Sequence, residues 1–242
     1  MAKNWRIGCS GFHYKEWKER FYPKGLAQKN WFSFYTQHFN TLELNVTFYR
    51  FPELKALLQW HHSAPDGFVF SAKVPRTVTH YKKFNDCKQV IADFYQVLRD
   101  GLQEKLGAVL FQLPPSFSYS PERLEQVLDH TDPAFTNVVE FRHASWWRPD
   151  VQERLKERRV SFCGVSFPGI VHDDAVVNTD TAYYRFHGVP VLFHSGYDEA
   201  FVHRIVDQLT TSPAETVYLY FNNTASMAAI ANAQQAIRHL QP

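Results

Sequence analysis

The chain has 242 residues, of which 21% are charged and 45% hydrophobic, and its formal net charge is +2. This length is close to the roughly 250 residues typical of an eight-fold β/α barrel, and it excludes a minimal binding module. The composition is that of a globular protein rather than a disordered one, and the small positive charge gives no sign of a strongly basic nucleic-acid-binding face.

Eight apolar segments along the chain are predicted to be strands. In chain order they are 7–9, 41–44, 68–73, 107–113, 138–141, 160–165, 182–186 and 216–221. The fourth segment is stopped by Pro114 and Pro115, because proline cannot continue a hydrogen-bonded central strand.

Amphipathic segments follow most of these strands and are predicted to be helices. Aromatic residues and a histidine between Trp31 and His38 recur at helical spacing, and Ser120-Pro121 is a typical helix start. Helices are expected at 31–38, 53–62, 90–98, from 120 onward, and at 149–155, 201–209 and 230–240. Residues 169–180, after the sixth strand, read as a weak helix or only a loop.

This alternation predicts an α/β fold with a parallel sheet. Strands such as Ala108–Phe111 are apolar on both faces, as in parallel strands covered by helices. A doubly wound open sheet is the alternative, but no glycine-rich phosphate loop follows the first strand. We therefore expect a single domain over residues 1–242 with the closed (β/α)₈ TIM-barrel fold.

Sequence features outside the strands bear on localisation. No segment approaches the ~18 consecutive apolar residues of a membrane span, and residues 1–5 show no apolar signal region. Cys9, Cys87 and Cys163 are odd in number, far apart and without paired spacing. We expect a cytoplasmic protein with reduced thiols that does not bind a membrane.

Polar residues close six of the eight predicted strands. They are Glu43, Asn45, Lys73, Gln112, Glu140, Arg142, Arg185, His187 and Asn222. Glu140 and Arg142 lie two residues apart and therefore face the same way from their strand. Barrel active sites lie at the carboxyl ends of the strands, and unused buried charges at one pole would be costly. The set therefore predicts a functional site, although any single member could be an ordinary paired rim residue.

The same residues suit general acid–base catalysis. Glu43 or Glu140 would accept a proton, and His187 or His80 would deliver one near neutral pH. Arg142 and Arg185 would stabilise developing negative charge. The alternative, equally weighted, is that Glu140 only pairs with Arg142 or with an arginine of a neighbouring strand. A two-carboxylate glycosidase is disfavoured, because strands two and five are expected to lie well apart around the ring.

The cations at these strand ends outnumber the carboxylates, which predicts an anionic ligand such as a phosphate or a carboxylate. Asn222 and Asn223 are expected to contact it, because they lead into the last helix, whose first N–H groups could bind an anion. Neither a metal nor a cofactor is expected, because the histidines lack metal-binding spacing; they are His80, His143, His187 and His194.

Aromatic residues in the loops supply a second kind of surface. Tyr14, Tyr49 and Trp147 are the candidates for ligand contact, whereas Phe48 and Trp146 are expected to pack. Together with basic residues, this rim could stack bases and hold phosphates; the basic residues are Arg50, Arg76, Lys82 and Lys83. Two functions therefore stay open: an enzyme of hydrolase or lyase type acting on a small anion, and a nucleic-acid-binding or phosphodiester-acting protein. The oligomeric state is also open.

Seven short motifs in order carry a resemblance to a known family. They are 8–11 (GCSG), 43–49 (ELNVTFY), 70–73 (FSAK), 111–115 (FQLPP), 140–143 (EFRH), 185–188 (RFHG) and 220–223 (YFNN). Together they resemble the YecE-like family, catalogued as domain of unknown function 72. The resemblance implies a TIM barrel and no established activity. This chain has Phe12 where the family commonly has tryptophan, and Ser166 where it often has an acid, so a mechanism that needs that acid is in doubt here.

Overall fold

Eight parallel strands form a closed barrel in the computed structural model, which describes residues 3–170 and 172–241. Each strand pairs with the next one, and β8 closes the ring on β1. The strands are β1 Asn4–Ser10, β2 Thr41–Leu44, β3 Val69–Lys73, β4 Leu106–Gln112, β5 Thr136–Glu140, β6 Val160–Ser166, β7 Thr181–Phe186 and β8 Thr216–Phe221. The predicted (β/α)₈ barrel is confirmed.

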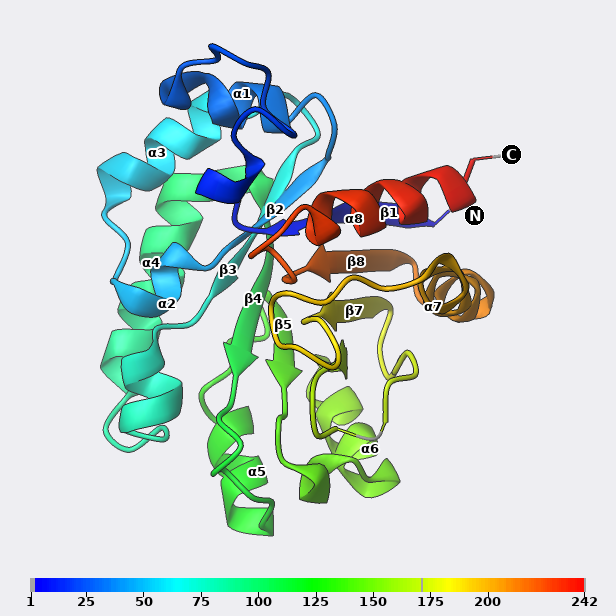
Figure 1. Ribbon diagram of the computed structural model, residues 1–242. Helices are drawn as coiled ribbons and strands as arrows, with labels where there is room; N and C mark the ends of the chain where they lie inside the picture. The colour runs from blue at the N-terminus through cyan, green and yellow to red at the C-terminus, as the bar shows by residue number, and fades with distance from the viewer. Residues whose placement is uncertain (1–2, 171, 242) are drawn as a thin grey trace.

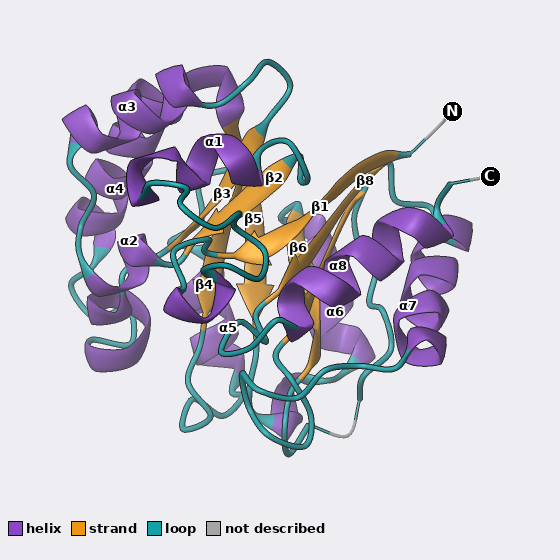
Figure 2. Ribbon diagram, turned by 45° about the horizontal axis from the view of Figure 1, so that its top comes forward, coloured by secondary structure: helices purple, strands orange, loops and turns teal. Residues whose placement is uncertain are grey.

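Helices surround the barrel, as Figure 1 and Figure 2 show. They are α1 Trp31–Tyr35, α2 Val46–Tyr49, α3 Leu54–Ser63, α4 Lys88–Leu102, α5 Pro121–Leu128, α6 Pro149–Glu157, α7 Glu199–Thr211 and α8 Ala228–His239. The predicted helix over 31–38 ends early, because the backbone tightens into turns in which Gln37 donates to Phe34 and His38 to Tyr35. The described residues of the 169–180 stretch form no helix, so it is a loop there.

The strands bury apolar residues on both faces. The outer face packs against the helices, and the inner face fills the ring. Outward residues such as Phe70 and Ala72 join a large cluster shared with the helices. Inward residues form a smaller cluster inside the ring, built from Ala108, Leu110, Val138, Cys163, Val165, Tyr183, Tyr218 and Tyr220. The barrel interior is thus a packed core, as in other closed eight-stranded barrels.

Tyrosine hydroxyls mark the change from this apolar interior to a polar end. The hydroxyl of Tyr220 bonds Thr41 Oγ1 at 2.5 Å and Ser71 Oγ at 2.9 Å. The hydroxyl of Tyr183 donates to Glu43 Oε2 at 2.6 Å. Both of these buried phenols therefore have hydrogen-bond partners, and that of Tyr183 is a carboxylate near the carboxyl end of β2.

The helix starts follow the local sequence signals. Ser120 caps α5 by accepting from the backbone N–H of Arg123 at 3.3 Å, with Pro121 in the first turn as predicted. Asp198 caps α7 by accepting from Phe201 N–H at 2.8 Å. No helix in the described ranges is long and apolar enough to cross a membrane. All three cysteines are free thiols, as expected.

Candidate active site

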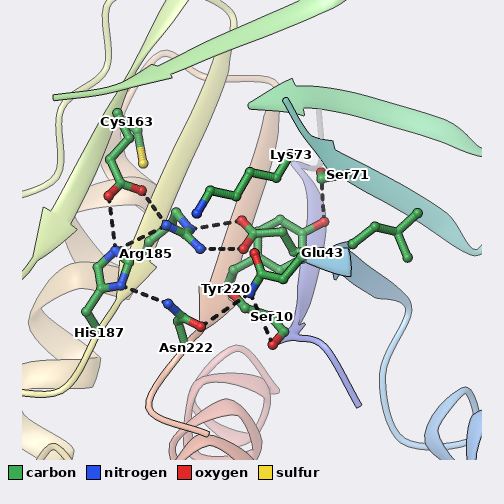
Figure 3. A network of polar contacts seen from close by, with 12 residues as sticks. Ser10, Glu43, Ser71, Lys73, Cys163, Arg185, His187, Tyr220 and Asn222 are labelled. Atoms are coloured by element: carbon green, nitrogen blue, oxygen red, sulfur yellow. Dashed lines mark hydrogen bonds and ion pairs between the residues drawn. The ribbon is translucent and has the colours of Figure 1, made fainter. Parts of the chain in front are cut away.

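A fully buried arginine joins two carboxylates at the mouth, the name used here for the barrel end formed by the carboxyl termini of the strands (Figure 3). Arg185 of β7 donates to Glu43 of β2 through Nε at 2.9 Å and Nη2 at 2.5 Å. Its Nη1 donates to Glu140 of β5 at 2.5 Å. All three side chains are 0% exposed. The guanidinium is therefore compensated by two charges from different sides of the ring.

Glu140 is held by a second arginine as well. Its Oε1 accepts from Arg142 Nε at 2.7 Å, as the alternation of the two residues predicted. Burial alone would raise the pKa of Glu140, but the charges of Arg185 and Arg142 outweigh burial and hold that pKa well below its ordinary value. Glu140 is thus a firmly ionised carboxylate and a weak proton acceptor. Its pairing with both arginines matches the alternative that gave it a charge-balancing role.

The two glutamates meet at one guanidinium, which corrects the expectation that strands two and five keep them well apart. Their contacts with Arg185 explain this, because its side chain spans the interior of the ring. The guanidinium stands between the carboxylates, where a glycosidase would need room for its substrate. Glu140 is also too firmly ionised to be a protonated acid. The geometry therefore still disfavours a glycosidase, for a different reason.

His187 lies behind this ion network and is fully buried. Its Nδ1 contacts Asn222 Nδ2 at 2.9 Å, and its Nε2 lies 3.3 Å from Glu140 Oε1. The tautomer that satisfies both contacts carries its proton on Nε2. Burial, the largest influence, lowers the pKa of His187 from 6.5 to about 3. The imidazole is uncharged at neutral pH, so it is not a source of protons in the way the sequence suggested.

His80 is the more accessible histidine of the mouth. It lies on a five-residue π-helix, Thr77–Tyr81, a form often found at functional sites. Its Nδ1 bonds Thr79 Oγ1 at 2.9 Å, and its ring meets Phe48 edge-on at 5.0 Å. Burial and the neighbouring Lys73 lower its pKa from 6.5 to about 4, so it too is uncharged near neutral pH.

Lys73, at the end of β3, has no carboxylate beside it. Its side chain reaches toward Arg185 (Figure 3), and its Nζ lies 3.9 Å from the centre of the Phe48 ring. Within residues 3–170 and 172–241, its Nζ makes neither a hydrogen bond nor an ion pair with protein. Burial, followed by the charges of Arg185 and Arg142, lowers the pKa of Lys73 well below its ordinary value. The residue is only 7% exposed.

Amide and hydroxyl groups complete the mouth. Asn45 Nδ2 lies 3.5 Å from Asn222 Oδ1 and from the backbone oxygen of Ser10. Asn45 Oδ1 and Ser10 Oγ are buried and have no hydrogen-bond partner in the described structure. Gln112 is less available, because its Nε2 donates to the backbone oxygen of Leu113 at 2.7 Å. Acceptor and hydroxyl capacity therefore lies unused on the β1–β2 side of the mouth.

Of three further predicted ligand contacts, Tyr14 borders this cluster, and Trp147 and Asn223 lie outside it. The hydroxyl of Tyr14 donates to the backbone oxygen of Ser10 at 2.5 Å and so supports the loop after β1. Trp147 packs edge-on against Phe162 of β6. Asn223 faces outward, where its Nδ2 donates to the backbone oxygen of Ser195 and to Asn232 Oδ1. Strand alternation explains the last case, because Asn222 already points inward.

Several contacts in the site were not predicted from the sequence. Tyr183 precedes Arg185 by two residues and therefore shares its face, which was a usable signal. Phe167 lies under the guanidinium of Arg142, 4.4 Å from ring centre to Cζ, but nothing in its loop context signals this contact. Phe48 was expected only to pack, whereas its ring lies against the Lys73 amino group.

Features elsewhere in the molecule give less indication of a functional site than the mouth does. In the described ranges, no group of three or more histidine, cysteine and acidic side chains is arranged to hold a metal ion. A surface hollow of about 830 Å³ lies at the opposite end of the barrel, beside the strand starts at Thr136 and Thr181. Its charged lining includes Lys156 and Arg159, which are exposed. Buried, mutually paired charges are found at the mouth instead, which is where chemistry is best supported.

One protein-family model matches nearly the whole chain. A family model described as "Protein of unknown function DUF72" matches residues 6–242. The UPF0759 protein YunF of Bacillus subtilis (strain 168) is 29% identical over 140 residues, which make up 55% of this chain. That match spans half the length of YunF.

Solved structures agree on the architecture. A DUF72 family protein from Thermotoga maritima is 27% identical, with a TM-score of 0.87 over 99% of this chain and 100% of that one. A DUF72 family protein from Enterococcus faecalis is 20% identical, with a TM-score of 0.81 over 99% of this chain and 98% of that one. At that lower identity the likeness concerns the fold alone.

Proposed function

Because the chain belongs to the DUF72 family, described as proteins of unknown function, we propose its function from its own site: an enzyme that acts by acid–base chemistry on a small anionic molecule bound at the mouth. This membership also bears out the resemblance to the YecE-like family. The observation that carries the proposal is the unpaired Lys73. Glu43 and Glu140 balance Arg185 and Arg142, so a protonated Lys73 leaves the mouth with one uncompensated positive charge.

Two basic side chains, Lys73 and Arg142, are available to an incoming anion. The Lys73 amine has no carboxylate beside it, and Arg142 contacts Glu140 through Nε, which leaves its two terminal nitrogens for a ligand. The Arg142 side chain is 12% exposed, whereas Arg185 is fully buried. A carboxylate or phosphate would meet Lys73 and Arg142 first and would bind a planar guanidinium well.

Acid–base roles follow from exposure and charge state. Glu43, Glu140 and His187 are fully buried and hold Arg185 and Arg142 in place. His80 is partly exposed and uncharged near neutral pH, and burial lowers the pKa of Lys73, so proton transfer is assigned to these two side chains first. The positive charges behind them stabilise negative charge that develops on the substrate.

A thermal-shift titration tests the anion site. Inorganic phosphate and acetate are expected to raise the melting temperature, because a ligand that binds the native state stabilises it. Lys73→Met and Arg142→Met should each remove most of that shift. Lys156→Met is the matched control, because Lys156 is exposed and its nearest carboxylate is Glu153 on the same helix. An unchanged melting temperature in the wild type with every anion would refute the site.

A second candidate function rests on an exposed aromatic surface beside the mouth. Tyr49 and Tyr81 are 66% and 64% exposed, and the Arg76 guanidinium lies 5.3 Å and 5.4 Å from their ring centres. Exposed rings beside a cation suit the stacking of unpaired bases. Fluorescence anisotropy with a single-stranded oligonucleotide separates the two functions. Binding that falls steeply with salt and is lost in Tyr49→Ala would favour nucleic acid.

A further inference from the structure

Two lysines are buried among the residues that the structure describes, and they have opposite surroundings. Lys105 lies before β4, at the far end of the barrel, and its Nζ donates to the backbone oxygens of His61 at 2.8 Å and Ala64 at 2.6 Å. Lys73 has a similar exposure, 7% against 8%, but its Nζ faces an aromatic ring instead of acceptors. Lys105 is therefore satisfied as a structural cation, whereas Lys73 is not.

The groups around Lys73 favour an uncharged amine. Those that face it from the neighbouring elements are Glu43 on β2, His80 on the π-helix, Glu140 and Arg142 at the end of β5, and Arg185 on β7. The carboxylates are bonded to the two arginines, and the influence of the arginines on the amine exceeds that of the carboxylates. An amine kept neutral by burial and by neighbouring cations is the form of lysine that attacks carbonyl carbon.

We propose that Lys73 is a nucleophile that forms a Schiff base with a small aldehyde or ketone carrying an anionic group. This inference rests on the proposed anion site. The terminal nitrogens of Arg142 would hold the carboxylate or phosphate of the substrate, which places its carbonyl within the same mouth as the amine. Phe48 and Phe167 supply apolar contacts beside Lys73 and Arg142, respectively.

The covalent step balances without an oxidant or a reductant. The Lys73 nitrogen forms a bond to the carbonyl carbon, and the carbon–oxygen π bond breaks to give a carbinolamine. A proton moves from nitrogen to oxygen, and a second proton lets that oxygen leave as water. The product is a protonated imine that can draw electrons from a neighbouring bond. The second proton comes from solvent water and is relayed by the uncharged imidazole of His80, which contacts the same Phe48 ring as Lys73.

Reductive trapping tests this step on the full-length protein. At neutral pH the protein is incubated with pyruvate, with glycolaldehyde phosphate or with acetone, and sodium cyanoborohydride reduces any imine to a stable amine. Peptide mapping by mass spectrometry then locates the adduct. We expect Lys73 to carry roughly tenfold more adduct than Lys105 or any exposed lysine, because only an uncharged amine reacts. The two anionic carbonyls should exceed acetone, and their ratio tells carboxylate from phosphate.

Two variants separate the nucleophile from the anion site. Lys73→Met should lose the adduct and the phosphate-dependent thermal shift, while its far-UV circular dichroism stays that of the wild type. Lys73→Arg keeps a cation and removes the nucleophile, so it should keep the thermal shift and lose the adduct. Because the adduct is mapped on wild-type protein, the test does not depend on how well either variant folds.

The outcomes distinguish the two claims. Stabilisation by phosphate or acetate without any adduct at Lys73 would overturn the nucleophile and leave the anion site standing. An adduct at Lys73 that is equally abundant with acetone, with no anion shifting the melting temperature, would support the nucleophile and overturn the anion site. Adducts spread over exposed lysines, with no thermal shift, would overturn both.

Discussion

At the scale of single residues, the mouth is governed by which charges are paired. Arg185 is the centre, because it bonds both buried carboxylates and has no exposure of its own. Removing one partner from a buried ion network leaves the others uncompensated, which costs more than the intact network contributes. The paired residues therefore hold the site together, and the unpaired Lys73 is left for chemistry.

Arg185→Met is expected to destabilise the protein by about 3–5 kcal/mol, because it leaves Glu43 and Glu140 buried with too few cations. Urea unfolding followed by circular dichroism measures this cost. The triple variant Glu43→Gln/Glu140→Gln/Arg185→Met should regain part of the loss, because no uncompensated charge remains. Arg154→Met, which breaks a solvent-exposed pair with Glu125, should change stability far less. A cost for Arg185→Met no larger than that control would contradict the network.

Acid sensitivity is a second consequence at this scale. Burial lowers the pKa of His187 from 6.5 in its ordinary state to about 3 in the folded protein. Between these values the unfolded chain binds a proton that the folded chain does not, so stability falls as the pH falls through this window. His187 should account for up to about 1.4 kcal/mol per pH unit there.

The variant His187→Gln isolates this contribution. Its stability should depend less steeply on pH than that of the wild type between about 6 and 4, and the two slopes should agree above pH 7. Urea midpoints measured across this range supply the comparison. Parallel curves at every pH would mean that folding does not lower the pKa of His187.

At the scale of elements, strand periodicity allowed the positions of most site residues to be predicted. Residues at the ends of β5 and β7 could be assigned to one face because side chains alternate with period two. Their partners could not be assigned, because Glu43 and Arg185 are 142 residues apart and meet only when the barrel closes. The absence of an ion-pair partner for Lys73 among the described residues could be recognised only after the carboxylates of the mouth had been assigned to the arginines. The loop residue Phe167 had no periodic signal at all.

The close approach of β1 and β2 at Gly8 leads to a prediction at this scale. A Cβ on Gly8 of β1 would lie 2.1 Å from the backbone oxygen of Thr41 on β2, so alanine cannot fit without separating the strands. Gly8→Ala should unfold the barrel or greatly lower its melting temperature. Gly196→Ala is the matched control, because its Cβ would lie an ordinary 3.5 Å from Ala228 Cβ. Equal melting temperatures for the two variants would contradict the close β1–β2 contact.

At the scale of the whole molecule, the barrel gathers charges that are distant in sequence into one compensated group. Four paired charges cancel, and the charge of the mouth then depends on whether Lys73 carries a proton. An anion that enters the mouth favours the protonated lysine, so anion binding and proton uptake are coupled. The rest of the molecule, including its exposed ion pairs, is not needed for this coupling.

The most direct measurement is a ¹⁵N NMR titration of the lysine side chains, with the Lys73 signal assigned from its absence in Lys73→Met. In the protein without added anion, Lys73 should be uncharged at neutral pH, with its pKa well below the usual lysine value. Saturating phosphate should raise that pKa, while exposed Lys156 stays unchanged. A Lys73 that titrates like Lys156 and ignores phosphate would contradict the account.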